Sequence, residues 1–410
     1  MDQRIEKVLV VGAGPVGLLT ALMLSKVGIS VQVYEKNTEI DQRPRGAAYG
    51  RAAVRVFRQA QVLDKLREMG VDVSSIAWRK LDGTRITGFS QEHNQSDPER
   101  SLVLPVHLLA QFLYDEVKSL PNVEVFWGHK FKTLTQTEDK VTVEFETDGG
   151  TVFSEANFVL GSDGAQSDVR KCLFGRNFPG MSWDVQIVAT NIKYSGFDIP
   201  GWSDVQWIIH PEHWALLCRL DREGTWRVAY GEKADLDTDT LRERLPSKFK
   251  AILPGSPEPG DYELLNWSPF VMHQRCVEKM TVGRVVLAGD AAHLCNPMGG
   301  LGLTGGIADV GSLVECLVAI HNGAADFSIL EKYDEKRREV YHTVTDPTSS
   351  GNLRRVFNDG ETVLEHDRML QMIEKSATDP ALGKILMQFE NALSSDMSQF
   401  YTPQQSEVSV

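Results

Sequence analysis

Residues Lys7–Glu35 read KVLVVGAGPVGLLTALMLSKVGISVQVYE, and this stretch decides the fold. The β-branched run Lys7–Val11 predicts a strand that is buried on both faces, as in a parallel sheet. Gly12, Gly14 and Gly17 follow with the spacing G-x-G-x-x-G. In that spacing the first glycine permits a tight turn, the second lets the backbone approach a pyrophosphate, and the third lets a helix pack close to the strand.

The rest of the stretch completes a dinucleotide-binding βαβ unit. A helix is expected over Leu18–Lys26, and its N-terminal N–H groups and dipole would attract phosphates. Gly28 marks the end of this helix, and Ile29–Tyr34 is expected as the second strand. Glu35 follows 18 residues after Gly17, about where a carboxylate accepts hydrogen bonds from ribose hydroxyls.

Size and charge restrict the function further. At 410 residues the chain exceeds the size at which one hydrophobic core stops growing, which favours two domains. A net charge of -13 disfavours nucleic acids and anionic membranes as partners. The five cysteines form no metal-ligand spacing, so we expect reduced thiols and no metal site. No signal-peptide pattern precedes the first strand, so we expect a cytoplasmic protein, with disorder at most in the polar tail after Tyr401.

Two later stretches repeat the pattern of an apolar strand followed by small and acidic residues. Phe158–Leu160 leads into GSDGAQSDVR at 161–170, and GRVVLA at 283–288 leads into GDAAHLCNPMGGLG at 289–302. Ligands of open α/β sheets bind outside the carboxyl ends of the strands. The acids of both stretches are therefore expected to face the same crevice as the glycine motif.

With these three motifs in this order, the chain resembles the flavin monooxygenases of the p-hydroxybenzoate hydroxylase type, which are single-component, NAD(P)H-using aromatic hydroxylases. The match spans most of residues 5–345. The resemblance implies that Glu35 binds the FAD ribose, that Asp290 holds the ribose and ribityl region, and that Asp163 supports the FAD and pyridine-nucleotide steps. It further implies cofactor contacts at Gly12, Gly14, Pro15, Val16, Gly17, Lys36, Arg45, Gln111, Pro297, Gly299, Gly300, Gly302 and Leu303.

The sequence departs from the family pattern near its third motif. Thr304 stands where the family often has Asn, and Cys295-Asn296 replaces the more usual apolar-proline lead into Pro297. The stretch 300–305 is formally a second G-x-G-x-x-G, but it follows a proline loop instead of a strand, and no acid ends a later strand. We expect its glycines to let the next helix N-terminus face the flavin pyrimidine edge, where the helix dipole stabilises the negative charge of reduced flavin.

Between Arg176 and Met280 the apolar residues alternate, which predicts half-buried antiparallel strands. The resemblance implies that such a sheet forms one wall of the active site. Candidates for catalysis by residue type are His210, His213, Arg227 and Tyr230, and the sequence does not choose a base among them. Further pocket candidates by type are Trp214, Arg219, Trp267 and His273. The Ser167, Asp168 and His293 set does not form a hydrolase triad, because no G-x-S-x-G turn precedes a helix.

The expected fold class is α/β: a Rossmann-like FAD-binding domain, an inserted β-sheet substrate domain and a C-terminal helical segment. The FAD-binding domain is expected to be discontinuous, over 1–72, 101–175 and 280–345. The substrate domain takes 73–100 and 176–279. The last segment, 346–410, contains amphipathic helices that cover the flavin domain or form a subunit interface in a monomer or homodimer.

The expected activity is FAD-dependent hydroxylation of a phenolic or polyketide-like molecule from secondary metabolism or aromatic breakdown. By resemblance, NAD(P)H reduces FAD and O2 adds at flavin C4a to form a hydroperoxide, while the protein supplies orientation and a dry site. Baeyer–Villiger oxidation, epoxidation or a dearomatising hydroxylation on the same fold stay open. A flavin-binding protein without turnover is the alternative from another class.

Overall fold

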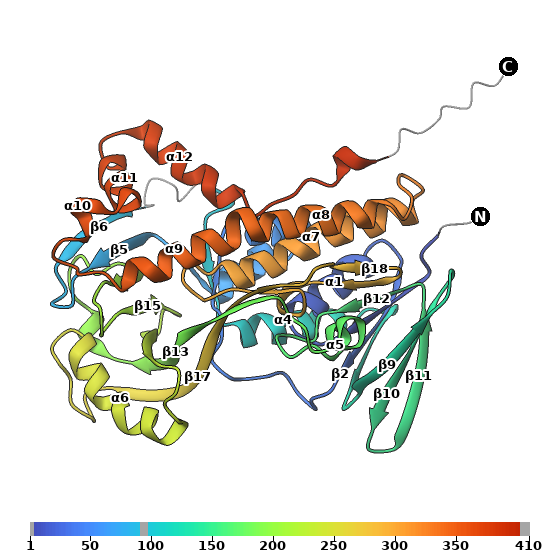
Figure 1. Ribbon diagram of the computed structural model, residues 1–410, viewed down its shortest axis with the longest axis horizontal. Coiled ribbons are helices and arrows are strands. Elements are labelled where there is room, and N and C mark those ends of the chain that lie inside the picture. Colours follow the sequence, from blue (N-terminus) through green and yellow to red (C-terminus); the bar gives the residue numbers. More distant parts are fainter. Residues whose placement is uncertain (1–3, 91–96, 402–410) are drawn as a thin grey trace.

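The computed structural model describes residues 4–90 and 97–401, and the polar tail expected after Tyr401 lies outside the described residues. Two sheets organise the molecule, one parallel and one antiparallel (Figure 1). The six-stranded sheet has the order β18-β19-β12-β1-β2-β8. Its strands are β1 (Lys7–Val11), β2 (Ser30–Glu35), β8 (Val123–Trp127), β12 (Phe158–Gly161), β18 (Thr281–Val282) and β19 (Val285–Leu287). All neighbours except β18 and β19 pair in parallel, which confirms the predicted Rossmann-like domain.

The strands of this sheet are apolar on both faces, and both helices and a small sheet of residues 130–156 pack against them. The helices that pack beside it are α1 (Pro15–Ser25), α4 (Val106–Val117) and α7 (Leu301–His321). Helix α1 begins three residues earlier than expected, because Pro15 occupies its first turn and has no N–H to lose. Of the helices in the described chain, α7 alone is long and apolar enough to cross a membrane, but 78% of its most apolar window is buried inside the protein. Such burial is that of a core helix.

The antiparallel sheet has eight strands in the order β20-β17-β13-β16-β15-β14-β5-β6. They are β5 (Ser75–Arg79), β6 (Arg85–Ser90), β13 (Gly180–Lys193), β14 (Val205–Ile208), β15 (Ala215–Arg219), β16 (Thr225–Lys233), β17 (Glu263–Cys276) and β20 (His293–Leu294). Helix α6 (Thr238–Ile252) packs on one face of this sheet. The strands come from both chain segments expected in the substrate domain, and β20 adds a short edge from the third motif, which was expected in the FAD-binding domain.

Three further groups of elements complete the chain. Two small sheets are formed by β3 (Ala48–Tyr49), β7 (Leu102–Val103) and β4 (Val71–Asp72), and by β9 (Lys130–Gln136), β10 (Val141–Thr147) and β11 (Gly150–Ala156). The short helices are α2 (Arg51–Gln59), α3 (Leu63–Met69), α5 (Asp168–Phe174), η2 (Ser195–Phe197) and η3 (Gly289–Ala291). The C-terminal helices are α8 (Ile329–Val340), η4 (Tyr341–Thr345), α9 (Asp346–Val356), α10 (Val363–His366), α11 (Arg368–Ser376), α12 (Pro380–Asn391) and η5 (Ser398–Phe400).

The C-terminal helices join the two parts of the molecule. Helices α7, α8 and α9 run lengthwise over it in Figure 1. Leu353 and Val356 of α9 are fully buried in an apolar cluster with residues of the antiparallel sheet. Beyond α12, Met397 is buried against the core of the parallel-sheet domain. The C-terminal segment was expected to cover the flavin domain or to form a subunit interface. Its described part packs against both the parallel-sheet domain and the antiparallel sheet.

Candidate active site

The three motifs meet at the carboxyl ends of three adjacent strands, β1, β12 and β19. The Ser162 backbone N–H donates to the Val11 carbonyl at 2.9 Å, and the Ala288 N–H donates to the Gly161 carbonyl at 3.1 Å. The Ser162 hydroxyl also donates to the Val11 carbonyl, at 3.1 Å. Segments separated by more than 100 residues in sequence are thus hydrogen-bonded into one edge.

The glycines of the first motif fit a dinucleotide. Gly12 has φ +108°, and a Cβ there would lie 2.5 Å from the Ser162 carbonyl oxygen. A Cβ at Gly17 would lie 2.1 Å from the Gly12 carbonyl oxygen, whereas a Cβ at Gly14 would meet nothing within 4 Å. No side chain caps the helix that begins at Pro15, so its first N–H groups remain available to an anion. A side chain at Gly12 or Gly17 would therefore clash with the protein, whereas the space beside Gly14 is free for a pyrophosphate.

Glu35 is fixed at the end of β2. Its Oε2 accepts from the Ala13 N–H at 3.0 Å, and its Oε1 accepts from the Asn37 Nδ2 at 2.7 Å. The carboxylate therefore lies beside the glycine turn, as the ribose-binding role requires, while Lys36 next to it is exposed. These positions support both assignments, which stay proposals.

Asp163 binds the first N–H groups of α5, whose N-cap residue is Ser167. Its carboxylate accepts from the Asp168 N–H at 2.7 Å and the Val169 N–H at 3.2 Å, and it also binds the Ser167 hydroxyl. Burial raises the pKa of Asp163, and these hydrogen bonds oppose the rise. In this position the carboxylate shapes the 161–168 turn and the start of α5. Nothing in the sequence favours this role over a direct cofactor contact.

Arg170 links the second motif to the third, and it was not among the predicted site residues. Its guanidinium donates to the Ala291 carbonyl at 3.1 Å and to the Ala165 carbonyl at 2.7 Å. It also lies 3.8 Å from the centroid of the Phe178 ring. The sequence feature that could have identified Arg170 is its position at the end of GSDGAQSDVR. An arginine in a stretch of small and acidic residues can donate hydrogen bonds to the carbonyls of a neighbouring turn.

The surroundings of Asp290 have opposing effects on its charged form. Its side chain is open to solvent, yet the protein around it withdraws hydration, and this desolvation raises the pKa of Asp290. Nearby His293, Arg45 and Arg170 oppose the rise. A carboxylate that is accessible but poorly hydrated, among cations, is suited to accept hydrogen bonds from cofactor hydroxyls. Asp290 and Arg45, each expected to contact the cofactor, therefore lie close enough to interact electrostatically.

Two amide side chains, those of Gln274 and Asn296, hold the Pro297 loop that precedes α7. The Gln274 Oε1 accepts from the Asn296 N–H at 2.6 Å, and the Asn296 Oδ1 accepts from the Met298 N–H at 3.0 Å. Asn296 is fully buried, so the departure from the family pattern serves as an anchor for the Pro297 loop. Burial raises the pKa of the neighbouring Cys295 thiol to about 12, which fits a packing role.

The glycines of this loop bring α7 close to the first domain segment. Gly300 adopts a left-handed conformation (φ +66°) as the residue before α7, and no side chain caps that helix. A Cβ at Gly300 would contact Ala48 at 3.4 Å, and Leu303 lies 3.1 Å from the Cβ position of Gly46. The Thr304 hydroxyl accepts from the Gly50 N–H at 3.0 Å. Thr304, which departs from the family pattern, therefore holds the loop before α2.

The antiparallel sheet presents one face to this loop and the other to α6. Ala229 of β16 and Ile187 of β13 belong to an apolar cluster that also contains Ala47, Trp214, Met298 and α9 residues. Tyr230, Trp226 and Val228 pack on the opposite face with α6. Because side chains alternate along a strand, Arg227 shares the face of Ala229. The residues of β16 alternate between two faces, but both faces are buried, so the prediction of a half-buried strand is wrong for β16.

Arg227 is a buried cation on the first face. Its Nε donates to the Asn191 Oδ1 at 2.7 Å, and its Nη1 donates to the Arg45 carbonyl. Among the residues that the structure describes, no carboxylate forms an ion pair with it. Burial lowers the pKa of Arg227 to about 10. An uncompensated guanidinium at this depth is costly unless an anion approaches it.

The other three catalytic candidates do not share this position. The Tyr230 ring is fully buried, centred 6.1 Å from the Phe249 ring of α6, and burial strongly raises the pKa of Tyr230. The His210 Nδ1 accepts from the His213 N–H at 3.0 Å within the turn between β14 and β15. His213 lies near Lys248 of α6, and burial lowers its pKa. The sequence could not assign these residues to a face, because the strand registers were not known.

The further pocket candidates divide in the same way. Trp214 joins the apolar cluster of the first face, whereas Trp267 packs with the α6 cluster. The Arg219 guanidinium lies 5.3 Å from the centroid of the Trp226 ring. His273 is hydrogen-bonded through Nδ1 to the Ser182 hydroxyl at 2.8 Å. Only Trp214 of these four lies in the cluster that contains Met298.

Gln111 lies on the exposed side of α4, where its Nε2 donates to Asp115 at 3.2 Å. The residue of α4 that lies near the site is His107, one turn earlier. Burial and the nearby Arg227 lower the pKa of His107, while Asp41 opposes the change. The neighbouring Val106 N–H donates to the Gly46 carbonyl at 3.1 Å, so the start of α4 abuts the loop that also binds Arg227. A histidine just after Pro105 was the signal in the sequence, and it was not among the predicted site residues.

Comparisons with known proteins agree with this geometry. Residues 6–348 match the family described as "FAD binding domain". The chain is 38% identical over 352 residues to para-nitrophenol 4-monooxygenase of Pseudomonas sp. (strain WBC-3), covering 85% of this chain and 87% of that protein. It is 34% identical over 358 residues to 6-hydroxy-3-succinoylpyridine 3-monooxygenase HspB of Pseudomonas putida (strain DSM 28022 / S16), covering 86% and 89%. The crystal structure of p-nitrophenol 4-monooxygenase PnpA from Pseudomonas putida DLL-E4 is similar with a TM-score of 0.89 and 36% identity, over 96% of this chain and 99% of that one.

Proposed function

The chain belongs to the FAD binding domain family of single-component, FAD-dependent aromatic monooxygenases, and within it we propose that this protein oxygenates a hydroxylated aromatic ring bound as its anion. The observation that carries the proposal is Arg227, a buried guanidinium without a carboxylate partner among the described residues, on the sheet face that meets the Met298 loop. An anionic ring would supply the missing negative charge.

FAD, when bound, accepts a hydride from NAD(P)H and activates O2 for transfer to the ring. The chain would hold it at three places: Gly14 and the start of α1 at the pyrophosphate, Glu35 at the ribose, and Asp290 at the ribityl chain. The uncapped start of α7 after Gly300 would face the pyrimidine edge, where its dipole favours negative charge. Each of these assignments fits the positions described above.

The apolar cluster beside Arg227 supplies the dry wall of the substrate chamber. Its members include Ala47, Trp214, Ala229, Met272 and Met298, drawn from both domains. An aromatic ring gains free energy by leaving water for such a surface, at about 25 cal/mol per Å² of apolar area buried. The same exclusion of water strengthens the attraction between Arg227 and an anionic oxygen. The chamber therefore selects a flat ring that carries negative charge.

The names of the two relatives narrow the substrate class. One acts at position 4 of para-nitrophenol, and the other at position 3 of a 6-hydroxypyridine. In both names the carbon to be oxygenated lies opposite the ring hydroxyl. An ionised hydroxyl donates electron density to the carbon opposite it, which is the carbon that an electrophilic oxygen attacks. We therefore propose a ring with a free hydroxyl para to the reacting carbon.

The test compares ring hydroxyls that can and cannot ionise. NADH and NADPH oxidation, O2 uptake and product mass would be measured with 4-nitrophenol, 3-nitrophenol and 4-nitroanisole, whose methyl ether cannot ionise. We expect 4-nitrophenol to stimulate NAD(P)H oxidation: oxygen adds at the carbon that carries the nitro group, nitrite leaves with the C–N electron pair, and the ring is released as a quinone. We expect 4-nitroanisole to give neither this oxidation nor the quinone. Equal turnover of the ether and the phenol would refute the anionic substrate. The cytoplasmic location and the monomeric or homodimeric state stay predictions.

A further inference from the structure

A second buried charge cluster lies behind the third motif, and no sequence motif pointed to it. Asp309 of α7 is fully buried and accepts three hydrogen bonds. Its Oδ2 accepts from the Gly289 N–H at 2.9 Å and binds the His293 Nε2 at 2.7 Å, while its Oδ1 accepts from the Arg337 Nε at 2.7 Å. Despite its burial, His293 and Arg337 lower the pKa of Asp309 to about 2.

Two of these donors flank the proposed cofactor ligand Asp290. Gly289 precedes it and adopts a left-handed conformation (φ +60°), and His293 follows three residues later. Both are held by one carboxylate oxygen of Asp309, so the position of the turn between them depends on that oxygen. His293 is 3% exposed and its Nδ1 has no hydrogen-bond partner among the described residues, so the ring makes one hydrogen bond, at Nε2, beside its contact with the Tyr341 ring.

The third donor, Arg337, connects Asp309 to the C-terminal part of the chain. Arg337 of α8 also donates through Nη1 to the Leu393 carbonyl at 2.7 Å and to the Ser395 hydroxyl at 3.1 Å. These residues belong to the segment Asn391–Ser395, which we call the C-terminal clasp. Its other side-chain hydrogen bonds are with Arg55 of α2, whose guanidinium binds the Asn391 Oδ1 at 3.0 Å and the Ser394 hydroxyl at 3.1 Å. The Leu393 side chain also packs against Ala52 and Ala308.

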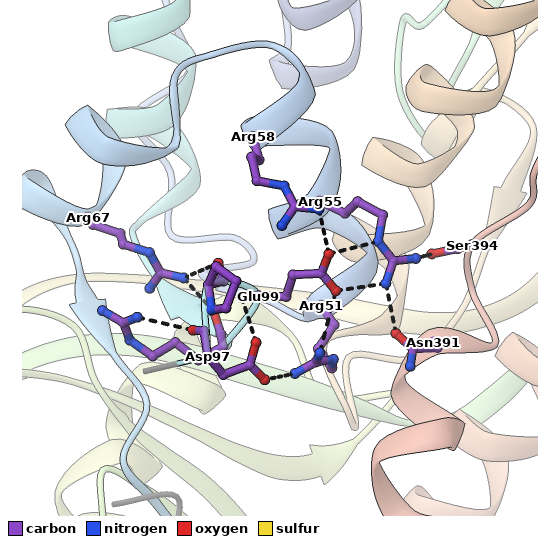
Figure 2. A network of polar contacts seen from close by, with 10 residues as sticks. Arg51, Arg55, Arg58, Arg67, Asp97, Glu99, Asn391 and Ser394 are labelled. Atoms are coloured by element: carbon purple, nitrogen blue, oxygen red, sulfur yellow. Dashed lines mark hydrogen bonds and ion pairs between the residues drawn. The ribbon is translucent and has the colours of Figure 1, made fainter. Parts of the chain in front are cut away.

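Figure 2 shows the Arg55 side of the clasp. Glu99 binds Arg55 at 2.7 Å and Arg58 at 2.7 Å, and Asp97 next to it binds Arg51. This network ties the clasp to α2 without touching Asp309. The clasp is therefore held by two separate arginines, of which only Arg337 shares a carboxylate with the turn at Asp290.

We propose that Asp309 is a positioning residue which couples cofactor retention to the docking of the C-terminal clasp, through Arg337. FAD fixes Asp290 and thereby its turn, the turn fixes Asp309, and Asp309 orients the arginine that holds residues 393–395. The inference rests on the proposed role of Asp290. Coupling of this kind is reciprocal, so a docked clasp tightens FAD binding by the factor by which FAD tightens the clasp.

The experiment uses three variants of the full-length flavoprotein. Asp309→Asn keeps the shape of the side chain but removes its charge, and Arg337→Lys keeps the charge but removes the fork that spans Asp309 and Leu393. Glu99→Gln is the matched control, because it loosens the clasp only at the Arg55 end. FAD dissociation constants, melting temperatures of the apoproteins, and hydrogen exchange of residues 391–401 with and without FAD would be measured.

We expect Asp309→Asn and Arg337→Lys to weaken FAD binding by about tenfold or more, and to abolish the FAD-dependent slowing of exchange in the clasp. Glu99→Gln should raise exchange in the clasp while changing FAD affinity less than about twofold. Should Asp309→Asn fail to fold, Arg337→Lys carries the test alone.

Unchanged FAD affinity in both Asp309→Asn and Arg337→Lys would overturn the proposal. It would also be overturned if Glu99→Gln, at the same melting temperature, lost as much FAD affinity as those two variants. Asp290→Asn keeps the two questions separate. If that variant retains FAD fully, the role of Asp290 is refuted, whatever Asp309 does.

Discussion

Substituting alanine at two glycines of the first motif separates packing from cofactor binding. In Gly17→Ala the new methyl would lie 2.1 Å from the Gly12 carbonyl oxygen and 2.8 Å from the Ser162 hydroxyl. The backbone must move by roughly 1 Å to relieve the first contact, since a close-packed interior has no void to absorb it. We expect the apoprotein to lose about 1–3 kcal/mol of stability, as overpacked cores do.

In Gly14→Ala the methyl meets nothing within 4 Å in the protein alone. Gly14 has φ −79° and ψ 177°, which alanine adopts without strain. The apoprotein should therefore be unchanged or more stable by about 0.4–1 kcal/mol, because alanine restricts the unfolded chain. With FAD bound, the same methyl would be forced into the pyrophosphate contact, at a cost of about 1–3 kcal/mol or roughly 5- to 150-fold in affinity.

The assay pairs thermal unfolding of the apoproteins with flavin titration followed by protein and flavin fluorescence. Gly17→Ala should lower the melting temperature without FAD, and Gly14→Ala should lower only the increase that FAD produces. The reasoning is refuted if Gly14→Ala binds FAD as tightly as the unmodified protein, because the open space at Gly14 would then not lie against the cofactor.

Three further predictions follow from the site. Tyr230→Phe should leave kcat within about twofold of the unmodified protein, because the Tyr230 hydroxyl lies on the α6 face of the sheet. Arg227→Met should raise KM for 4-nitrophenol at least tenfold, because it removes the cation proposed to face the anionic oxygen. Steady-state kinetics of both variants checks these two expectations. The native pKa of Asp309, about 2 against 3.8, means that its contribution of about 2 kcal/mol is present above pH 4 and is lost as pH falls towards 2. The difference in unfolding free energy between Asp309→Asn and the unmodified protein should therefore shrink between pH 5 and pH 3 in urea titrations. Thr304→Val leaves the Gly50 N–H without its acceptor and should cost about 1 kcal/mol in the same titrations at pH 7.

The sequence could predict whatever depends on local spacing. The first motif, its acid and the two later motifs each combine a strand with a turn of small residues, and the carboxyl ends of adjacent parallel strands meet by necessity. The spacing of the three glycines indicates both kinds of position: a side chain would clash with the protein at Gly12 and Gly17, while Gly14 leaves space for a ligand. The outer strands β9 and β11 of the three-stranded sheet escaped prediction because they are largely exposed and their apolar alternation is weak. The middle strand β10 alternates regularly as VTVEFET, so its pattern was present in the sequence.

The sequence could not predict what depends on strand register or on helix packing. Arg227 and Tyr230 are three residues apart on one strand, so a single register decides which of them faces the chamber. Asp309 lies within an apolar helix, and its partner Arg337 lies in the next helix, so their pairing required the packing of α7 on α8. His107 escaped because its importance comes from the loop that it abuts and not from a motif of its own.

The loop of residues 45–50 explains why the two domains act as one. Its carbonyl at Arg45 accepts from Arg227 of the antiparallel sheet, and its N–H at Gly50 donates to Thr304 at the start of α7. The same loop pairs with β7 through Ala48 and receives the start of α4 at Gly46. A ring bound against Arg227 would therefore pull on the loop that borders the cofactor site. Because that loop has hydrogen-bonding partners on the antiparallel sheet and at the start of α7, it fixes the position of Arg227 relative to the third motif.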